Sequence, residues 1–155
     1  MKTAFLLIFS CTLIFSGCGL FTNADKLYSL AQEKREIGNH AEALEILEKI
    51  VRKYSQHEIA ANSQYLIAEI YYVNFRDFKS SIENYEKLSK LFPLSEKVPH
   101  AHFMQGFIYA NMLSEFEKAE KVYSEFLKLY PHHELIPSVE FELEFLGKDI
   151  EDIPI

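Results

Sequence analysis

The side chains with most potential for chemistry in this sequence are its six histidines, four of which form two close pairs. His100 and His102 are two residues apart, and His132 and His133 are adjacent. Residues two apart on a helix point to nearly opposite sides, whereas two ligands on one face need a spacing of three or four. The acidic residues nearby show no metal-ligand spacing. We therefore predict no metal site and interpret these histidines as solvated residues at the joints between helices.

Motifs for catalysis are also missing from the sequence. It contains no Gly-x-Ser-x-Gly, no Gly-rich phosphate loop and no His-Glu-x-x-His. Acid pairs such as Glu140 and Glu142 are spread along one stretch, as on the exposed face of an ordinary soluble helix. We predict no catalytic residue, no cofactor and no small-molecule substrate, and hence that the protein is not an enzyme.

The composition predicts one folded domain built from helices. Of the 155 residues, 48% are hydrophobic, which argues against a disordered chain. There are only five Gly and five Pro, fewer than several strands joined by tight turns would require. The formal net charge of −7 makes nucleic acid an unsuitable partner, because its phosphates need concentrated Lys and Arg.

The first 17 residues have the order of an export signal. Lys2 is followed by an apolar run over residues 4–15 and then by small residues. The run has 12 residues, against roughly 18 or more for a helix that crosses a bilayer, so we prefer a signal peptide over residues 1–17 to a membrane anchor.

The end of this signal resembles the lipobox of bacterial lipoproteins, because Ser16 and Gly17 precede Cys18. The resemblance implies that Cys18 carries the lipid and begins the mature chain, with residues 18–23 as a lipidated linker. Several acyl chains hold a protein firmly on a membrane. Gly19 stands where an Asp implies inner-membrane retention, which favours the outer membrane. Since Cys11 leaves with the signal, no thiol remains for a disulfide.

The rest of the chain repeats with a period that predicts a solenoid. Tyr54, Phe92 and Tyr130 are spaced by 38 residues. Each ends an amphipathic helical pattern, over residues 40–54, 78–92 and 116–130. The preceding helical patterns, over 26–38, 62–74 and 100–112, share a small residue that allows close helix packing: Ala31, Ala68 and Gly106. Compared with the first unit, the second and third units have one extra residue, which we expect in the turn inside each unit.

These units resemble the tetratricopeptide repeat, a helix–turn–helix unit of about 34 residues. The resemblance covers residues 24–147. It is carried by Ala31, Gly38, Ala43, Leu47 and Ser55 in the first unit, by Ala68, Tyr71, Ser81, Tyr85 and Pro93 in the second, and by Gly106, Tyr109, Ala119, Tyr123 and Pro131 in the third.

This family implies an all-α fold, a right-handed α-solenoid of three helix pairs and a capping helix. We expect units at about 24–57, 58–96 and 97–134, a cap at 137–147 and a tail at 148–155. Apolar and acidic residues alternate between Val139 and Phe145, a pattern that alone favours a strand. We predict a helix, because the repeat register continues and a stack of helix pairs needs a cap with one polar face.

One surface of this solenoid is a candidate binding groove. In the family, the first helices line a concave surface that binds extended peptides or partner helices. One position in successive first helices is aromatic each time: Tyr28, Tyr65, Phe103 and Phe141. These rings either anchor a partner as an aromatic ladder or pack between neighbouring helices. The resemblance implies a partner-binding groove formed by Tyr28, Gln32, Arg35, Tyr65, Glu69, Tyr72, Phe103, Phe107, Asn111 and Phe141.

The signal, the lipobox and the repeats together predict a lipid-anchored, non-catalytic scaffold that binds protein partners in the bacterial cell envelope. It resembles the tetratricopeptide lipoprotein of the outer-membrane β-barrel assembly machinery, which implies the periplasmic side of the outer membrane. One alternative is a soluble periplasmic coordinator of septation or of the Tol–Pal system. Another is an accessory subunit of an export system.

Overall fold

The computed structural model describes residues 23–148. The predicted signal peptide, Cys18 and the tail after Lys148 lie outside the described residues. Within this range the secondary structure is helical and contains no strand, so the all-α prediction is confirmed. The first helices of the pairs are α1 (Asn23–Glu36), α3 (Glu58–Ile70) and α5 (Lys97–Phe107), and the second helices are α2 (His40–Lys53), α4 (Phe78–Leu91) and α6 (Phe116–Leu129), with α7 (Ile136–Glu144) after them.

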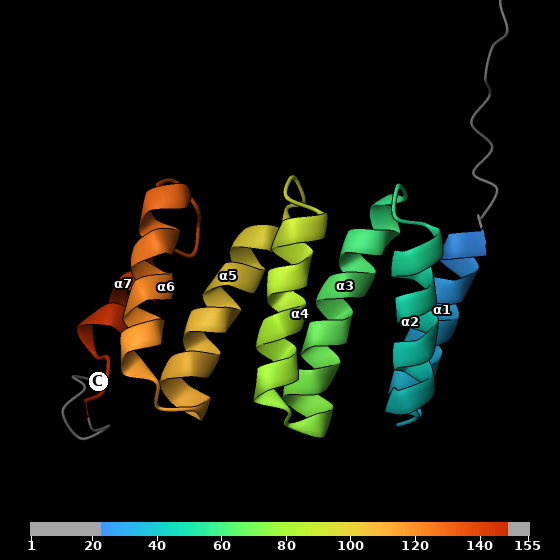
Figure 1. The fold of residues 1–155 in the computed structure, drawn as a ribbon, viewed down its shortest axis with the longest axis horizontal. Coiled ribbons are helices and arrows are strands. Elements are labelled where there is room, and N and C mark those ends of the chain that lie inside the picture. Colours follow the sequence, from blue (N-terminus) through green and yellow to red (C-terminus); the bar gives the residue numbers. More distant parts are fainter. Residues whose placement is uncertain (1–22, 149–155) are drawn as a thin grey trace, which may run out of the picture.

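The helices pack in sequence as a row of antiparallel pairs, α1 with α2, α3 with α4 and α5 with α6, and α7 packs against α6 at the end (Figure 1). The predicted α-solenoid of helix pairs is therefore confirmed. The N-terminus of α1, the connections 54–57 and 92–96, and the C-terminus of α6 lie along the upper edge in Figure 1. We call this the joint edge. The turns inside the pairs lie along the opposite edge.

The core follows the repeat. Leu47, Tyr85 and Tyr123 occupy one position in successive second helices, and all three are fully buried. Burial of one such side chain stabilises the fold by about 1.5–3 kcal/mol. The small-residue position of the first helices is also closed to solvent, since Ala31 and Ala68 are 0% exposed. Together with other buried side chains, these residues belong to three core clusters, and each cluster includes residues of adjacent helices.

The small residues bring the two helices of a pair close together, as the sequence predicts. The hydroxyl of Ser81 on α4 donates a 2.9 Å hydrogen bond to the carbonyl oxygen of Ala68 on α3. In the next unit a side chain at Gly106 would collide with the ring of Tyr123. A larger residue at either first-helix position would separate the pair.

The prediction that the extra residue lies in the turn is wrong. At their C-terminal ends, α3 and α5 widen into short π-helices, η1 (Tyr71–Phe75) and η2 (Ile108–Met112). A π-turn takes one more residue than an α-turn and leaves the rest of the helix in register. The extra residue is therefore accommodated inside the helix, where the N–H groups of Arg76 and Leu113 donate to the carbonyl oxygens of Tyr71 and Ile108.

The turns that follow these helices share one backbone conformation. Gly38, Arg76 and Ser114 are 38 residues apart and have positive φ angles of 80°, 52° and 53°. Asn39 and Asp77 then cap the next helix, since their side chains accept hydrogen bonds from the backbone N–H groups of Glu42 and Ser80 at 3.3 and 3.1 Å. One tight turn geometry thus recurs although only the first unit has glycine.

The alternating segment 139–145 is largely helical, as predicted from the register, and α7 ends at Glu144. Pro137 lies in its first turn, where the absence of an N–H costs nothing. Val139 is fully buried, whereas Phe141 is 48% exposed and its ring packs 4.8 Å from that of Phe145. A helix with one buried face fits the end of the stack.

Candidate partner-binding surface

The ten predicted groove residues lie on the first-helix side of the stack, which we call the first-helix surface. Four of them are exposed to solvent: Gln32, Arg35, Asn111 and Phe141. The other six are half-buried: Tyr28, Tyr65, Glu69, Tyr72, Phe103 and Phe107. That they bind a partner stays a prediction, since geometry alone does not test it.

Charged side chains connect successive first helices across this surface. The Arg35 guanidinium on α1 lies 3.6 Å from the Glu69 carboxylate on α3. Partial burial raises the pKa of Glu69 above its ordinary value, and the positive charges of Arg35 and Lys97 oppose that rise. The Lys97 ammonium on α5 also lies 5.6 Å from the centre of the Tyr65 ring, a cation–π contact. The surface therefore presents alternating charges beside aromatic rings.

A small cavity of about 250 Å³ opens beside this ion pair. It is lined by Arg35, His40, Glu69, Ile70, Val73 and Asn74. Val73 is 63% exposed, and the His40 Nδ1 atom is shielded from solvent without a hydrogen bond to the described residues. The cavity offers both an apolar contact and charged groups to a bound side chain.

The aromatic residues of this surface contact the second helices. The Tyr65 ring lies 5.4 Å from that of Tyr85 on α4, and the Phe103 ring lies 6.0 Å from that of Tyr123 on α6. Burial raises the pKa of the Tyr65 hydroxyl above its ordinary value. Among the described residues no ring contact joins Tyr65 to Phe103, and whether these rings also anchor a partner stays a prediction.

The last unit and the cap are joined by one carboxylate. Glu142 Oε2 on α7 accepts a 3.0 Å hydrogen bond from the Asn111 amide and a 3.2 Å hydrogen bond from the Tyr123 hydroxyl. The sequence predicted an exposed surface acid at Glu142, because the residues that it contacts are 19 and 31 positions away. Asn111 is thus held in place on the first-helix surface.

The histidines act mainly in the fold. His57 Nδ1 and His133 Nδ1 accept hydrogen bonds from the backbone N–H groups of Ile59 and Leu135 at 3.3 and 3.2 Å. They therefore cap the helical turns that follow. His102 is half-buried against the rings of Phe126 and Tyr130, so the expectation of a solvated residue is wrong for it. Its ring serves as packing surface.

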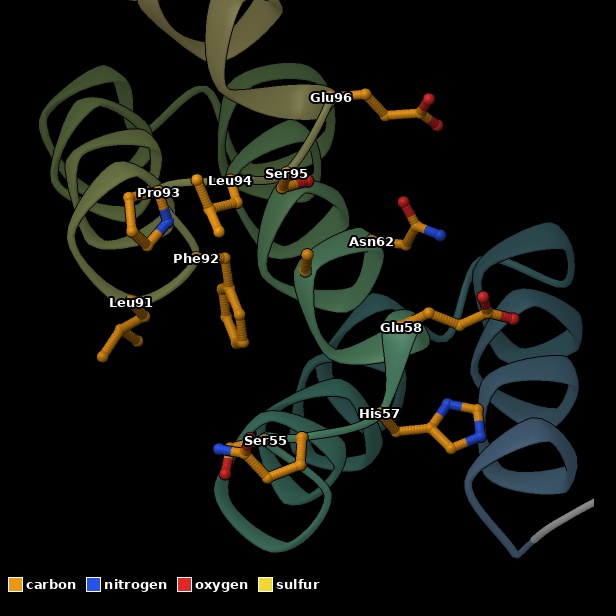
Figure 2. A pocket seen from close by; sticks show the side chains of 12 residues that line it. Ser55, His57, Glu58, Asn62, Leu91, Phe92, Pro93, Leu94, Ser95 and Glu96 are labelled. Atoms are coloured by element: carbon orange, nitrogen blue, oxygen red, sulfur yellow. The ribbon is translucent and has the colours of Figure 1, made fainter.

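A second cavity, of about 720 Å³, lies on the joint edge and outside the predicted groove. Figure 2 shows Leu91, Phe92, Pro93 and Leu94 on one side of it. His57, Glu58, Asn62 and Glu96 point away from them on the other side. The sequence did not predict this cavity, because the connections were interpreted as joints alone. The two leucines of the turn sequence Leu91–Leu94 were the available signal.

The part of the chain between Asn23 and Lys148 offers neither a metal site nor a membrane-spanning helix. No group of three or more His, Cys, Asp or Glu side chains there could hold a metal ion. None of its helices has the length and apolarity needed to cross a membrane.

Comparison with known families identifies the chain over most of the described range. No curated protein matches the sequence. The model of the YfiO family, described as outer membrane lipoprotein, matches residues 22–121, which cover the first two units and extend into α6 of the third. This match agrees with the lipobox at Cys18 and with the stacked helix pairs. The chain therefore belongs to the YfiO family of outer membrane lipoproteins.

Proposed function

We propose that this protein is a lipid-anchored, non-catalytic scaffold that binds a partner protein on its first-helix surface, in the assembly of outer-membrane proteins. Membership of an outer membrane lipoprotein family supports the location in the envelope. The resemblance to the lipoprotein of the β-barrel assembly machinery supports the process. The lack of catalytic motifs in the sequence supports a binding role rather than an enzymatic one.

The observation that carries the proposal is the pair formed by Arg35 and Glu69, which bridges two units on the first-helix surface. Both side chains are about two-fifths exposed, so each has hydrogen-bonding capacity left for a partner. Gln32 lies on the same side of α1 and is exposed. Such partly exposed polar groups next to half-buried aromatic rings suit recognition of a peptide or a helix.

The test is copurification of partners from detergent-solubilised envelopes with the full-length tagged protein. Tyr65 and Phe103 are unsuitable for substitution, because they pack against the second helices. The combined variant Gln32→Ala and Arg35→Glu changes two exposed residues of α1 and removes the ion pair with Glu69. We expect it to recover about tenfold less partner, which corresponds to about 1.4 kcal/mol of binding free energy.

The matched control is Lys87→Glu, which makes the same charge change at an exposed position of α4. We expect this variant to retain the partner. Equal recovery with both variants, at unchanged thermal stability, contradicts binding on the first-helix surface. The intact mass of the mature protein tests the anchor separately, because acylation at Cys18 excludes a soluble periplasmic product.

A further inference from the structure

The joint edge carries unusually exposed leucines. Leu94, in the connection between α4 and α5, is 99% exposed. Leu91 and Leu129 stand at equivalent positions in the last turns of α4 and α6, and they are 57% and 62% exposed. Three such side chains on one edge form an apolar row that the fold itself does not bury, which marks a candidate interaction surface.

The charges on this edge are sorted by side. Arg52, Lys90 and Lys128 occupy one repeat position in the last turns of the second helices, directly before Lys53, Leu91 and Leu129. Glu58, Glu96 and Glu134 occupy the equivalent position at the other side of the connections. Figure 2 shows this separation, with Leu91 and Leu94 away from Glu58 and Glu96. A basic and apolar strip thus runs along the second-helix side of an otherwise acidic protein.

The predicted anchor lies close to this edge. The N-terminus of α1, at Asn23, is on the joint edge (Figure 1). Cys18 precedes Asn23 by five residues, which reach at most about 18 Å when fully extended. The opposite edge lies a helix length farther, about 20 Å for the 14 residues of α1. The joint edge is therefore the edge nearer to a lipid on Cys18, and we expect this edge to face the membrane surface.

We propose that the second-helix side of the joint edge lies on the phospholipid surface, with Leu94 in the headgroup region and with Leu91 and Leu129 beside it. Arg52 and Lys128 then face the phosphates, which basic side chains attract near a membrane, and so does Lys90, whose exposed ammonium also pairs with Glu86 at 3.2 Å. Apolar side chains next to basic ones are typical of protein surfaces that rest in this interface. The first-helix surface stays free for a protein partner. This inference rests on the anchor at Cys18 proposed above.

The test uses single-cysteine variants of the full-length protein, purified from membranes and reconstituted in vesicles of phosphatidylethanolamine and phosphatidylglycerol. Because Cys18 is acylated and Cys11 is removed with the signal, a new cysteine is the one thiol available for labelling. Leu94→Cys carries a polarity-sensitive fluorophore. Ile37→Cys is the matched control, since Ile37 is 66% exposed and lies in the turn between α1 and α2 on the opposite edge.

We expect the label at position 94 to shift its emission to the blue and to be quenched several-fold more than the label at position 37 by lipids that carry a nitroxide. Adding Leu91→Ser and Leu129→Ser should reduce that quenching. If Cys18 is acylated and both labels report water, the membrane contact is wrong while the anchor stands. If the intact mass shows no acyl chains, the anchor and this inference both fail.

Discussion

Gly106 lies directly against the ring of Tyr123: a Cβ atom added at Gly106 would be 2.5 Å from Tyr123 Cε1. Tyr123 is fully buried, so its ring has little room to move. Gly106→Ala gains about 1 kcal/mol in helix propensity but incurs an overpacking cost of typically 1–3 kcal/mol. We expect a net loss of about 1 kcal/mol of unfolding free energy, measured by urea denaturation followed by circular dichroism.

The control for this prediction uses the first unit, where Ala31 occurs with Leu47 instead of a tyrosine. In a Tyr123→Leu background the ring is absent, and Gly106→Ala should no longer destabilise the protein. A loss of stability of the same size in both backgrounds rules out the ring as the cause. The double-mutant cycle measures this coupling directly.

Removing the hydroxyl of Tyr85 and removing that of Tyr123 should change the stability of the protein differently. The Tyr123 hydroxyl donates to Glu142, whereas the Tyr85 hydroxyl is buried without a hydrogen bond among the described residues. Burial raises the pKa of the Tyr85 hydroxyl, and Tyr65 adds to this rise, but the two hydroxyls lack the geometry of a hydrogen bond. We expect Tyr123→Phe to cost about 1 kcal/mol and Tyr85→Phe to be neutral or slightly stabilising in thermal melts. Equal losses would show that Tyr85 has a partner.

The positive φ angles predict opposite effects at equivalent turn positions. Ser114 has φ 53°, which costs a residue with a Cβ atom about 1–2 kcal/mol, whereas glycine adopts it freely. Ser114→Gly should therefore raise the melting temperature by a few degrees. Gly38→Ala, at φ 80° and with open space around it, should lower it by a similar amount. A lower melting temperature for Ser114→Gly speaks against the common turn geometry.

His102 should make the fold sensitive to mild acid. Its partial burial lowers the pKa of the imidazole below the ordinary 6.5, against a weaker opposing effect of Glu125. The unfolded chain binds the proton more readily than the folded one, so stability is complete above pH 6.5 and falls as the pH drops below it. His102→Gln should flatten this decline between pH 7 and pH 5.5 in urea titrations, with the remaining slope due to groups such as His100. An unchanged slope means that His102 does not carry it.

The repeat made most of the fold predictable. A spacing of 38 residues fixed which residues are equivalent, and therefore that Leu47, Tyr85 and Tyr123 share a buried position. The same register favoured a helix over a strand at Val139, although the local pattern pointed the other way. Periodicity over a whole chain constrains local structure more strongly than alternation over seven residues does.

The features that the sequence did not reveal depend on contacts between distant residues. The π-turns at Tyr71–Phe75 and Ile108–Met112 were missed because one inserted residue has the same spacing whether it widens a helix or lengthens a turn. The joining role of Glu142 needs Asn111 and Tyr123 in three dimensions. The same holds for the exposure of Leu94, which no pattern within the turn determines.

The central claim is that the first-helix surface binds a protein, and photo-crosslinking in intact cells tests it most directly. A photoreactive amino acid replaces Gln32 on α1 or Asn111 on η2, with Glu83 on α4 as the exposed control on the second-helix side. We predict that positions 32 and 111 crosslink to one and the same protein and that position 83 does not. Crosslinks to that protein from position 83 alone, or from none of the three positions, would contradict the account.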